Sequence, residues 1–139
     1  MNQPSTDAFS SDTGSVAATQ LKAAEEVPAD DRIDVALIQM VSAPDLELNL
    51  VRAEALIKQA VALGAELVSL PEYFCLLGRR DTDKVSLREP WGEGPIQQFL
   101  ADVATRYKIW LAAGTIPLQC LDPRRVRNSQ LMIDPQGKV

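Results

Sequence analysis

The stretch "IDVALIQM", residues 33–40, is the first strongly apolar segment of the 139-residue sequence and decides its fold class. Apolar side chains occupy both sets of alternate positions, with Ile33, Val35 and Leu37 in one set and Ala36, Ile38 and Met40 in the other. This pattern predicts a β-strand that is covered on both faces. Such strands are typical of parallel sheets, in which a helix connects one strand to the next.

The sequence that follows supplies this helix and a second strand. After the turn "SAPD", apolar residues recur at helical spacing, namely Leu46, Leu50, Ala53, Ile57, Ala60 and Val61. Gly64 is suited to end the helix because glycine readily adopts the left-handed conformation found at helix C-termini. The segment "AELVSL", residues 65–70, then predicts a short strand. Residues 33–70 are therefore expected to form a β-α-β unit with parallel strands.

The second half of the chain predicts another helix and two more strands. Residues 78–94 form a polar connection that is long enough to favour a functional loop. Pro95 suits the first turn of a helix, whose expected inner face is Ile96, Phe99, Leu100, Val103 and Tyr107. The segments "IWLAAGTI" and "VRNSQLMID" read as a third and a fourth strand. A type I turn is expected at "DPQG", residues 134–137.

Two domain-level expectations follow from this pattern. Residues 1–31 contain few large apolar side chains and many Ser, Thr, Ala and acidic residues, so we expect a disordered leader. Residues 32–139 form the folded part. A strand that runs into a tight turn normally pairs with a strand beyond it, yet only Lys138 and Val139 follow the turn. We therefore expect a truncated α/β domain.

Composition excludes several classes of function. The net charge is −5 and basic residues cluster only in "DPRRVRN", so a nucleic-acid partner is not expected. The sequence contains no apolar run long enough to span a bilayer and no signal peptide, which predicts a cytoplasmic protein without a membrane partner. The absence of histidine removes a Ser-His-Asp triad and most zinc sites. No P-loop or dinucleotide fingerprint is present, so neither a cofactor nor a metal is expected.

The segment "LVSLPEYFCLLG", residues 67–78, contains the candidate catalytic groups. Glu72 follows the second predicted strand, where open α/β sheets form their ligand sites, and a partly desolvated carboxylate there could act as a general base. The alternative is a glutamate that caps the next turn or pairs with Arg79 or Arg80. Cys75 and Cys120 lack the cationic surroundings of a reactive thiol, which favours packed thiols. The run "GRRDTDK" could bind an anion or remain a solvated charge cluster.

Four segments together resemble the N-terminal portion of the carbon-nitrogen hydrolase (nitrilase) superfamily, in its Nit-type amidase branch. They are "VALIQM", "NLVRAEALIKQAVALGAELVSLPEYF", "REPWGEGPIQQFLADVATRYKIWLAAGTIP" and "RNSQLMIDPQGKV". The resemblance implies a four-layer α-β-β-α sandwich, a small-molecule amide substrate and a homo-oligomer in the complete protein. It also implies that Glu72 is the general base, acting with a lysine that stabilises the oxyanion and a cysteine that forms a thioester.

The sequence departs from the family pattern in its catalytic groups. The family lysine lies shortly beyond "DPQGKV" and the family cysteine much further on, so neither is among these 139 residues. Lys138 precedes the position of the family lysine, and Cys75 is too early to be the family nucleophile. We therefore expect Glu72 to be functional, Cys75 to be structural, and the 139-residue chain alone to be inactive. The alternative is a non-catalytic module that pairs with a full-length relative or another partner.

Overall fold

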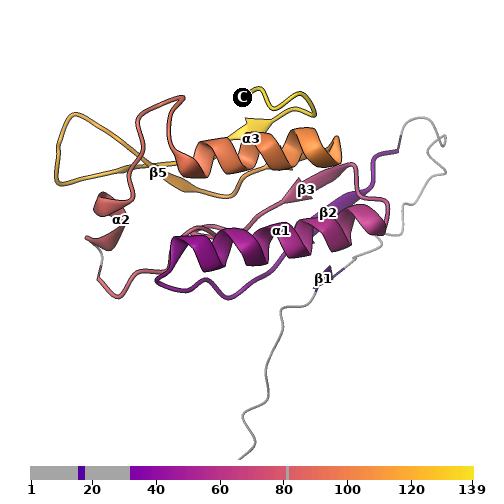
Figure 1. Ribbon diagram of the computed structural model, residues 1–139, viewed down its shortest axis with the longest axis horizontal. Helices are drawn as coiled ribbons and strands as arrows, with labels where there is room; N and C mark the ends of the chain where they lie inside the picture. The colour runs from indigo at the N-terminus through magenta and orange to yellow at the C-terminus, as the bar shows by residue number, and fades with distance from the viewer. Residues whose placement is uncertain (1–15, 18–31, 81) are drawn as a thin grey trace, which may run out of the picture.

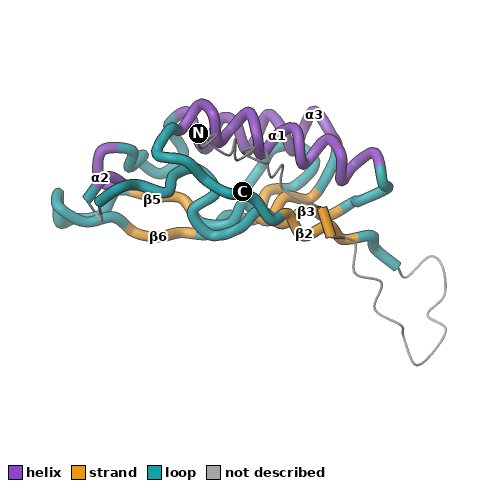
Figure 2. Tube along the Cα trace, turned by 90° about the horizontal axis from the view of Figure 1, so that it is seen from below, coloured by secondary structure: helices purple, strands orange, loops and turns teal. Residues whose placement is uncertain are grey.

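The computed structural model describes residues 16–17, 32–80 and 82–139. Helices α1 and α3 lie side by side on one face of the main sheet (Figures 1 and 2). The elements are β1 (Val16–Ala17), β2 (Val35–Ile38), α1 (Leu46–Ala62), β3 (Leu67–Ser69), α2 (Asp83–Ser86), α3 (Pro95–Tyr107), β4 (Trp110–Ala112), β5 (Ile116–Leu118), β6 (Arg127–Ser129) and β7 (Met132–Ile133).

The main sheet has the strand order β1-β2-β3-β4-β7. Its central strands β2, β3 and β4 are parallel, with Val35 opposite Leu67 and Leu67 opposite Trp110. Strands β1 and β7 join the edges in antiparallel orientation. The predicted α/β class and the β-α-β unit are confirmed. Strand β1 lies within the predicted leader, and the rest of that prediction falls on residues 1–15 and 18–31, outside the described residues.

Helix α1 begins and ends at the signals that the sequence carries. The Asp45 side chain accepts a hydrogen bond from the backbone N–H of Leu48 at 3.0 Å, which satisfies one of the free donors of the first turn. After the last turn, Gly64 adopts φ +97°, a left-handed conformation that glycine accommodates without strain. Between these ends, Ala53 and Ile57 are fully buried. The predicted amphipathic helix is therefore confirmed.

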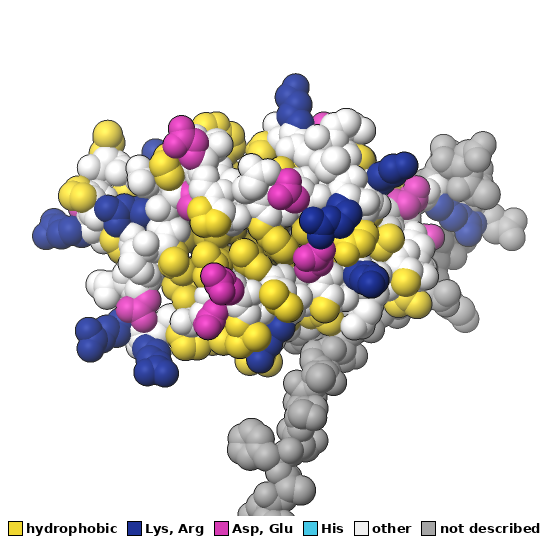
Figure 3. Space-filling model, in the orientation of Figure 1, with side chains coloured by type: hydrophobic (Ala, Val, Ile, Leu, Met, Phe, Trp, Pro, Cys, Tyr) yellow, Lys and Arg dark blue, Asp and Glu magenta, His cyan; other side chains and the backbone are white. Residues whose placement is uncertain are grey.

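Helix α3 packs beside α1 through the face that the sequence predicts. Its buried residues are Ile96, Leu100, Val103 and Ala104. On its exposed side, Arg106 forms an ion pair with Glu54 of α1, and the Tyr107 hydroxyl donates to the same carboxylate at 3.2 Å. The helical side of the molecule carries scattered acidic and basic side chains without a continuous patch of one sign (Figure 3).

The opposite face of the main sheet is exposed, so the expected burial of both faces of residues 33–40 is wrong within the described residues. Ala36 and Ile38 are buried under the helices, whereas Val35 and Leu37 are 49% and 62% exposed. Trp110 on β4 and Met132 on β7 of the same sheet are also exposed. The reason is that α1 and α3 both cover the same side of the sheet (Figure 2). Apolar side chains at both sets of alternate positions show that either face of the strand could be buried. They do not specify which element covers each face.

The two strands predicted in the second half are each divided. The segment 109–116 contributes β4 to the main sheet and then turns at Gly114, which has φ +58°, so that β5 begins a separate ribbon. The segment 126–134 likewise contributes β6 to that ribbon and β7 to the main sheet. The turn at residues 134–137 is confirmed, because the backbone N–H of Gly137 donates to the Asp134 carbonyl at 2.9 Å.

Candidate active site

Glu72 lies in a tight turn at the carboxyl end of β3. The strand pairing extends as far as Leu70, whose backbone N–H donates to the Ala112 carbonyl at 2.9 Å. Pro71 then lacks a backbone donor, and its carbonyl accepts a hydrogen bond from Phe74 at 3.3 Å. Glu72 is therefore held where the chain leaves the parallel strands, which is the edge at which open α/β sheets form ligand sites.

The Glu72 carboxylate is exposed, and it accepts a hydrogen bond from a side chain of the β5–β6 ribbon. Its Oε1 atom accepts from Asn128 Nδ2 at 3.1 Å. The ion pairs found in residues 32–80 and 82–139 do not join Glu72 to Arg79 or Arg80, which are its alternative partners. The backbone N–H groups of these two arginines donate to Asp83 Oδ2, at 2.8 and 3.1 Å. The expected partial desolvation of Glu72 is not found in these 139 residues, because its side chain remains open to solvent.

Gly114 allows the connection between β4 and β5 to lie directly against this turn. A Cβ atom at position 114 would lie 2.1 Å from the Pro71 carbonyl oxygen, far closer than any ordinary contact. The next residue, Thr115, accepts a hydrogen bond at its Oγ1 from the backbone N–H of Tyr73 at 3.2 Å. The backbone on both sides of Glu72 is therefore fixed by residues 114 and 115.

A buried asparagine links the same turn to the segment that follows β2. Asn49, fully buried on α1, accepts from the backbone N–H of Ala43 and donates to the Ala43 carbonyl, both at 2.7 Å. It also donates to the Cys75 carbonyl at 2.9 Å. Because a buried amide stabilises a fold only when its hydrogen bonds are made, Asn49 holds the end of the turn in one position.

Cys75 is a packed thiol in this structure. Its side chain is buried, and that burial, together with the nearby negative charge of Glu89, raises the pKa of the thiol to about 11. At neutral pH the Cys75 side chain is therefore almost entirely the neutral thiol, whereas the nucleophilic form of a cysteine is the thiolate. Cys120 is half-buried and lies on a loop, where its Sγ contacts the Asp122 carbonyl at 3.4 Å.

Glu89 is a buried carboxylate that the sequence reasoning missed. It is 4% exposed and accepts the backbone N–H groups of Ile96 and Gln97, at 2.5 and 3.0 Å, at the start of α3. Gly94 is required beside it, because a Cβ atom there would lie 2.3 Å from the Glu89 side chain. The sequence signal was a glutamate a few residues ahead of Pro95, close to a helix N-terminus that favours negative charge.

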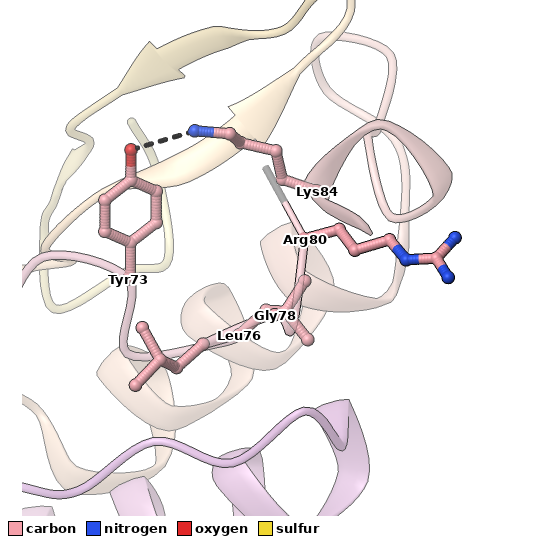
Figure 4. Close-up of a pocket in the computed structure, with 6 residues that line it drawn as sticks. Tyr73, Leu76, Gly78, Arg80 and Lys84 are labelled. Atoms are coloured by element: carbon pink, nitrogen blue, oxygen red, sulfur yellow. Dashed lines mark hydrogen bonds between the residues drawn. The ribbon is translucent and has the colours of Figure 1, made fainter. Parts of the chain in front are cut away.

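A pocket opens beside the turn, between residues 73–80 and α2. Its lining residues are Tyr73, Leu76, Leu77, Gly78, Arg80 and Lys84, and its volume is about 180 Å³ (Figure 4). Lys84 Nζ donates to the Tyr73 hydroxyl at 3.2 Å and lies 5.0 Å from the centre of its ring. The sequence placed Lys84 in the run "GRRDTDK" and left open whether that run binds an anion.

In residues 16–17, 32–80 and 82–139, no group of three or more His, Cys, Asp or Glu side chains is close enough together to hold a metal ion. No helix in the described part of the chain is long and apolar enough to cross a membrane.

The sequence is similar to one known protein family and to relatives within it. Residues 34–139 match the family described as Carbon-nitrogen hydrolase. A deaminated glutathione amidase of Synechocystis sp. is 36% identical over 104 residues, which are 74% of this chain and 38% of that protein. An omega-amidase of Saccharomyces cerevisiae is 34% identical over 118 residues, covering 78% of this chain and 39% of its own length.

Solved structures give the same relationship at the level of the fold. The crystal structure of Saccharomyces cerevisiae Nit3, a member of branch 10 of the nitrilase superfamily, superposes with a TM-score of 0.66 at 30% identity, covering 76% of this chain and 41% of that one. A CN-hydrolase superfamily protein of Xanthomonas campestris gives a TM-score of 0.61 over 74% and 37% of the two chains, and at 24% identity it supports the fold alone. The chain thus spans about two fifths of the relatives named here.

Proposed function

Because the chain belongs to the carbon-nitrogen hydrolase family, we propose that it is the N-terminal portion of an enzyme that hydrolyses the amide bond of a small molecule. The observation that supports this proposal is the position of Glu72, in a turn fixed on both sides at the carboxyl end of β3. Relatives named as amidases make an amide the proposed substrate class.

The proposed role of Glu72 is that of general base. A thiol is a weak nucleophile until its proton is removed, so a carboxylate beside it can accept that proton as the sulfur attacks the amide carbon. A cation near the carbonyl oxygen then stabilises the negative charge of the tetrahedral intermediate. After the amine leaves, water attacks the thioester. By resemblance the cysteine and the lysine are residues that these 139 positions do not include.

The proposal therefore predicts that the 139-residue chain by itself does not hydrolyse amides, since groups that act as one catalytic unit lose nearly all activity together. The test is a chimera in which residues 34–139 replace the matching segment of the Synechocystis amidase. We expect the chimera to release the amine product of the amide substrate, and the 139-residue chain to release none above background. Hydrolysis by the 139-residue chain that Glu72→Gln abolishes would contradict the proposed division of catalytic groups.

A second candidate function, a non-catalytic module that pairs with a full-length relative, is favoured by the exposed apolar sheet face. Trp110 on this face is 44% exposed, and Trp91 offers an exposed tryptophan at another place, in the connection before α3. Pairing through the sheet predicts that Trp110→Ser reduces co-purification with the relative and that Trp91→Ser does not. An equal effect of the two changes would exclude the sheet face as the contact. Homo-oligomer formation and cytoplasmic location stay predictions.

A further inference from the structure

We infer that Glu89 is a positioning residue for the proposed base, because its carboxylate fixes the β5–β6 ribbon from which Asn128 donates to Glu72. This role rests on the proposed amidase function, in which Glu72 accepts a proton from the nucleophile. Glu89 is buried at the start of α3 and acts on the reaction only through the groups that hold Glu72. Its side chain, its backbone and the ribbon each supply one part of that connection.

The Glu89 carboxylate supplies the N-terminal cap that α3 otherwise lacks. The residue before the helix is Gly94, which has no side chain to accept a hydrogen bond from the first turn. Glu89 accepts instead from the backbone N–H groups of Ile96 at 2.5 Å and Gln97 at 3.0 Å, and from Gln97 Nε2 at 3.0 Å. Negative charge is stabilised at a helix N-terminus. The carboxylate therefore holds residue 89 in a fixed place relative to α3.

The backbone of Glu89 is hydrogen-bonded to β5. Its N–H group donates to the Pro117 carbonyl at 3.0 Å, and its carbonyl accepts from the Gln119 N–H at 2.9 Å. These two hydrogen bonds place Glu89 beside Leu118 in a parallel bridge. Strand β5 thus pairs with residue 89 along one edge and with β6 along the other (Figure 2). Glu89 therefore joins α3 to the ribbon.

The ribbon carries the connection on to the proposed base. Asn128 on β6 lies opposite Pro117 on β5, the residue whose carbonyl accepts from Glu89. Asn128 Nδ2 in turn donates to Glu72 Oε1 at 3.1 Å. If Asn128 moved away by about 0.5 Å, this distance would reach about 3.6 Å, which is no longer a hydrogen bond. A small shift of residue 89 that β5 and β6 follow is therefore sufficient to release Glu72.

The charge of Glu89 makes its position sensitive to substitution. The side chain is 4% exposed, and the ion pairs in the described residues involve the carboxylates of Glu54 and Asp122 and not Glu89. The N–H groups at the start of α3 therefore stabilise its charge. In Glu89→Gln the side chain keeps one acceptor oxygen and gains an NH2 group. That NH2 group would face an N–H donor of α3, so residue 89 or the first turn of the helix must move.

The first test follows the side-chain amide of Asn128 by NMR in the 139-residue chain and involves no turnover. Glu72→Ala removes the acceptor and shows where the signals of the free amide lie. We expect Glu89→Gln to shift the Asn128 signals toward that position, while the dispersion of the other signals shows that the chain is folded. The matched control is Glu93→Gln, at an exposed glutamate of the same connection, which should leave the Asn128 signals unchanged.

A second pair of variants displaces Glu89 without removing its charge. A Cβ atom at position 94 would lie 2.3 Å from the Glu89 carboxyl carbon, whereas one at position 92 would meet nothing within 4 Å. The two glycines have φ +122° and +80°, so Gly92→Ala also strains the backbone but makes no such contact. We expect Gly94→Ala to shift the Asn128 signals and Gly92→Ala to leave them in place. This pair decides the question if Glu89→Gln does not fold.

The second test is a double-mutant cycle on kcat in the chimera. Because the effect of Glu89 passes through Asn128, Glu89→Gln should lower kcat several-fold, by no more than Asn128→Ala does, with KM unchanged. In a chimera that already carries Asn128→Ala, Glu89→Gln should lower kcat no further. A purely structural effect would instead reduce the amount of folded enzyme, and with it the measured kcat, by the same factor in both chimeras.

Two results would overturn the inference. They are Asn128 signals that stay in place in the folded Glu89→Gln or Gly94→Ala chain, and a fall in kcat that is equal with and without the Asn128 side chain. The outcomes also separate this role from the amidase proposal. If the Asn128 signals move and every chimera is inactive, Glu89 still positions Glu72 and the amidase proposal fails. If the chimera is active and Glu89→Gln leaves its kcat unchanged, the positioning role alone fails.

Discussion

Replacement of Gly114 by alanine tests whether the turn that carries Glu72 is fixed by the close approach of the β4–β5 connection. The alanine methyl group would lie 2.1 Å from the Pro71 carbonyl oxygen and 2.9 Å from the Leu70 carbonyl oxygen. One backbone segment must move by about 0.9 Å before even a 3.0 Å contact is reached, because 3.0 minus 2.1 is 0.9. Since Pro71 is bonded to Glu72, that movement displaces the proposed base.

The destabilisation can be estimated from two contributions. Placing a residue with a Cβ at φ +58° costs about 1 to 2 kcal/mol. The shift also disturbs two backbone hydrogen bonds next to Gly114, from Leu70 to Ala112 and from Ala113 to Leu131, each 2.9 Å long. A hydrogen bond contributes about 1 kcal/mol net. The free energy of unfolding should therefore fall by about 3 to 4 kcal/mol.

Gly92→Ala separates the backbone cost from the steric cost. Gly92 has φ +80°, and a Cβ atom there would meet nothing within 4 Å. Its replacement should cost only the conformational term of about 1 to 2 kcal/mol. Urea unfolding of the 139-residue chain, followed by circular dichroism, measures both variants. If the two substitutions lower the free energy of unfolding by the same amount, the close approach of residue 114 to the turn does not stabilise it as argued.

Three further predictions concern groups around the turn. Folding raises the pKa of the Cys75 thiol from 9.0 to about 11. The thiol therefore contributes its full stabilisation below pH 9, and the free energy of unfolding should fall by about 2 to 3 kcal/mol between pH 9 and 11. Cys75→Ala should remove this fall, and a fall of equal size in that variant would show that the Cys75 thiol does not cause it. Glu89→Gln should lower the free energy of unfolding by about 2 kcal/mol, because an amide cannot accept all the N–H groups that the carboxylate accepts. The control is Glu93→Gln at an exposed position, which should change the free energy of unfolding little. Thermal melts of the two variants test this difference. Asn128→Ala in the chimera should lower kcat several-fold with KM unchanged, and an unaltered kcat would show that this hydrogen bond does not position Glu72.

The helices and the parallel strands could be predicted because their signals are local. Asp45 and Gly64 mark the two ends of α1 within the sequence itself, and Pro95 marks the start of α3. The division of the third strand was less accessible. A glycine within an apolar run marks a possible bend, but only the contact of Gly114 with Pro71, far away in the sequence, explains why the chain must bend there.

The candidate site could be predicted only in part for the same reason. Glu72 stands at the end of an apolar run, so sequence position alone indicated the edge of the sheet. Its partner Asn128 lies 56 residues away in the sequence and reaches it through the β5–β6 ribbon, whose pairing no local pattern specifies. Lys84 likewise meets Tyr73 only because the polar segment folds back over the turn. Side chains that contact one another through tertiary structure leave no periodic signal in the sequence.

The formation of the thioester in the chimera tests the central claim most directly. Glu66, which is exposed and immediately precedes β3, is the matched control for Glu72, which lies beyond the other end of the same strand. The chimera is mixed with amide substrate, quenched with acid within the first turnover, and its intact mass is measured. A general base at position 72 predicts an acyl adduct on the unaltered chimera and on Glu66→Gln, and none on Glu72→Gln. An adduct that forms at the same rate on Glu72→Gln would contradict the account.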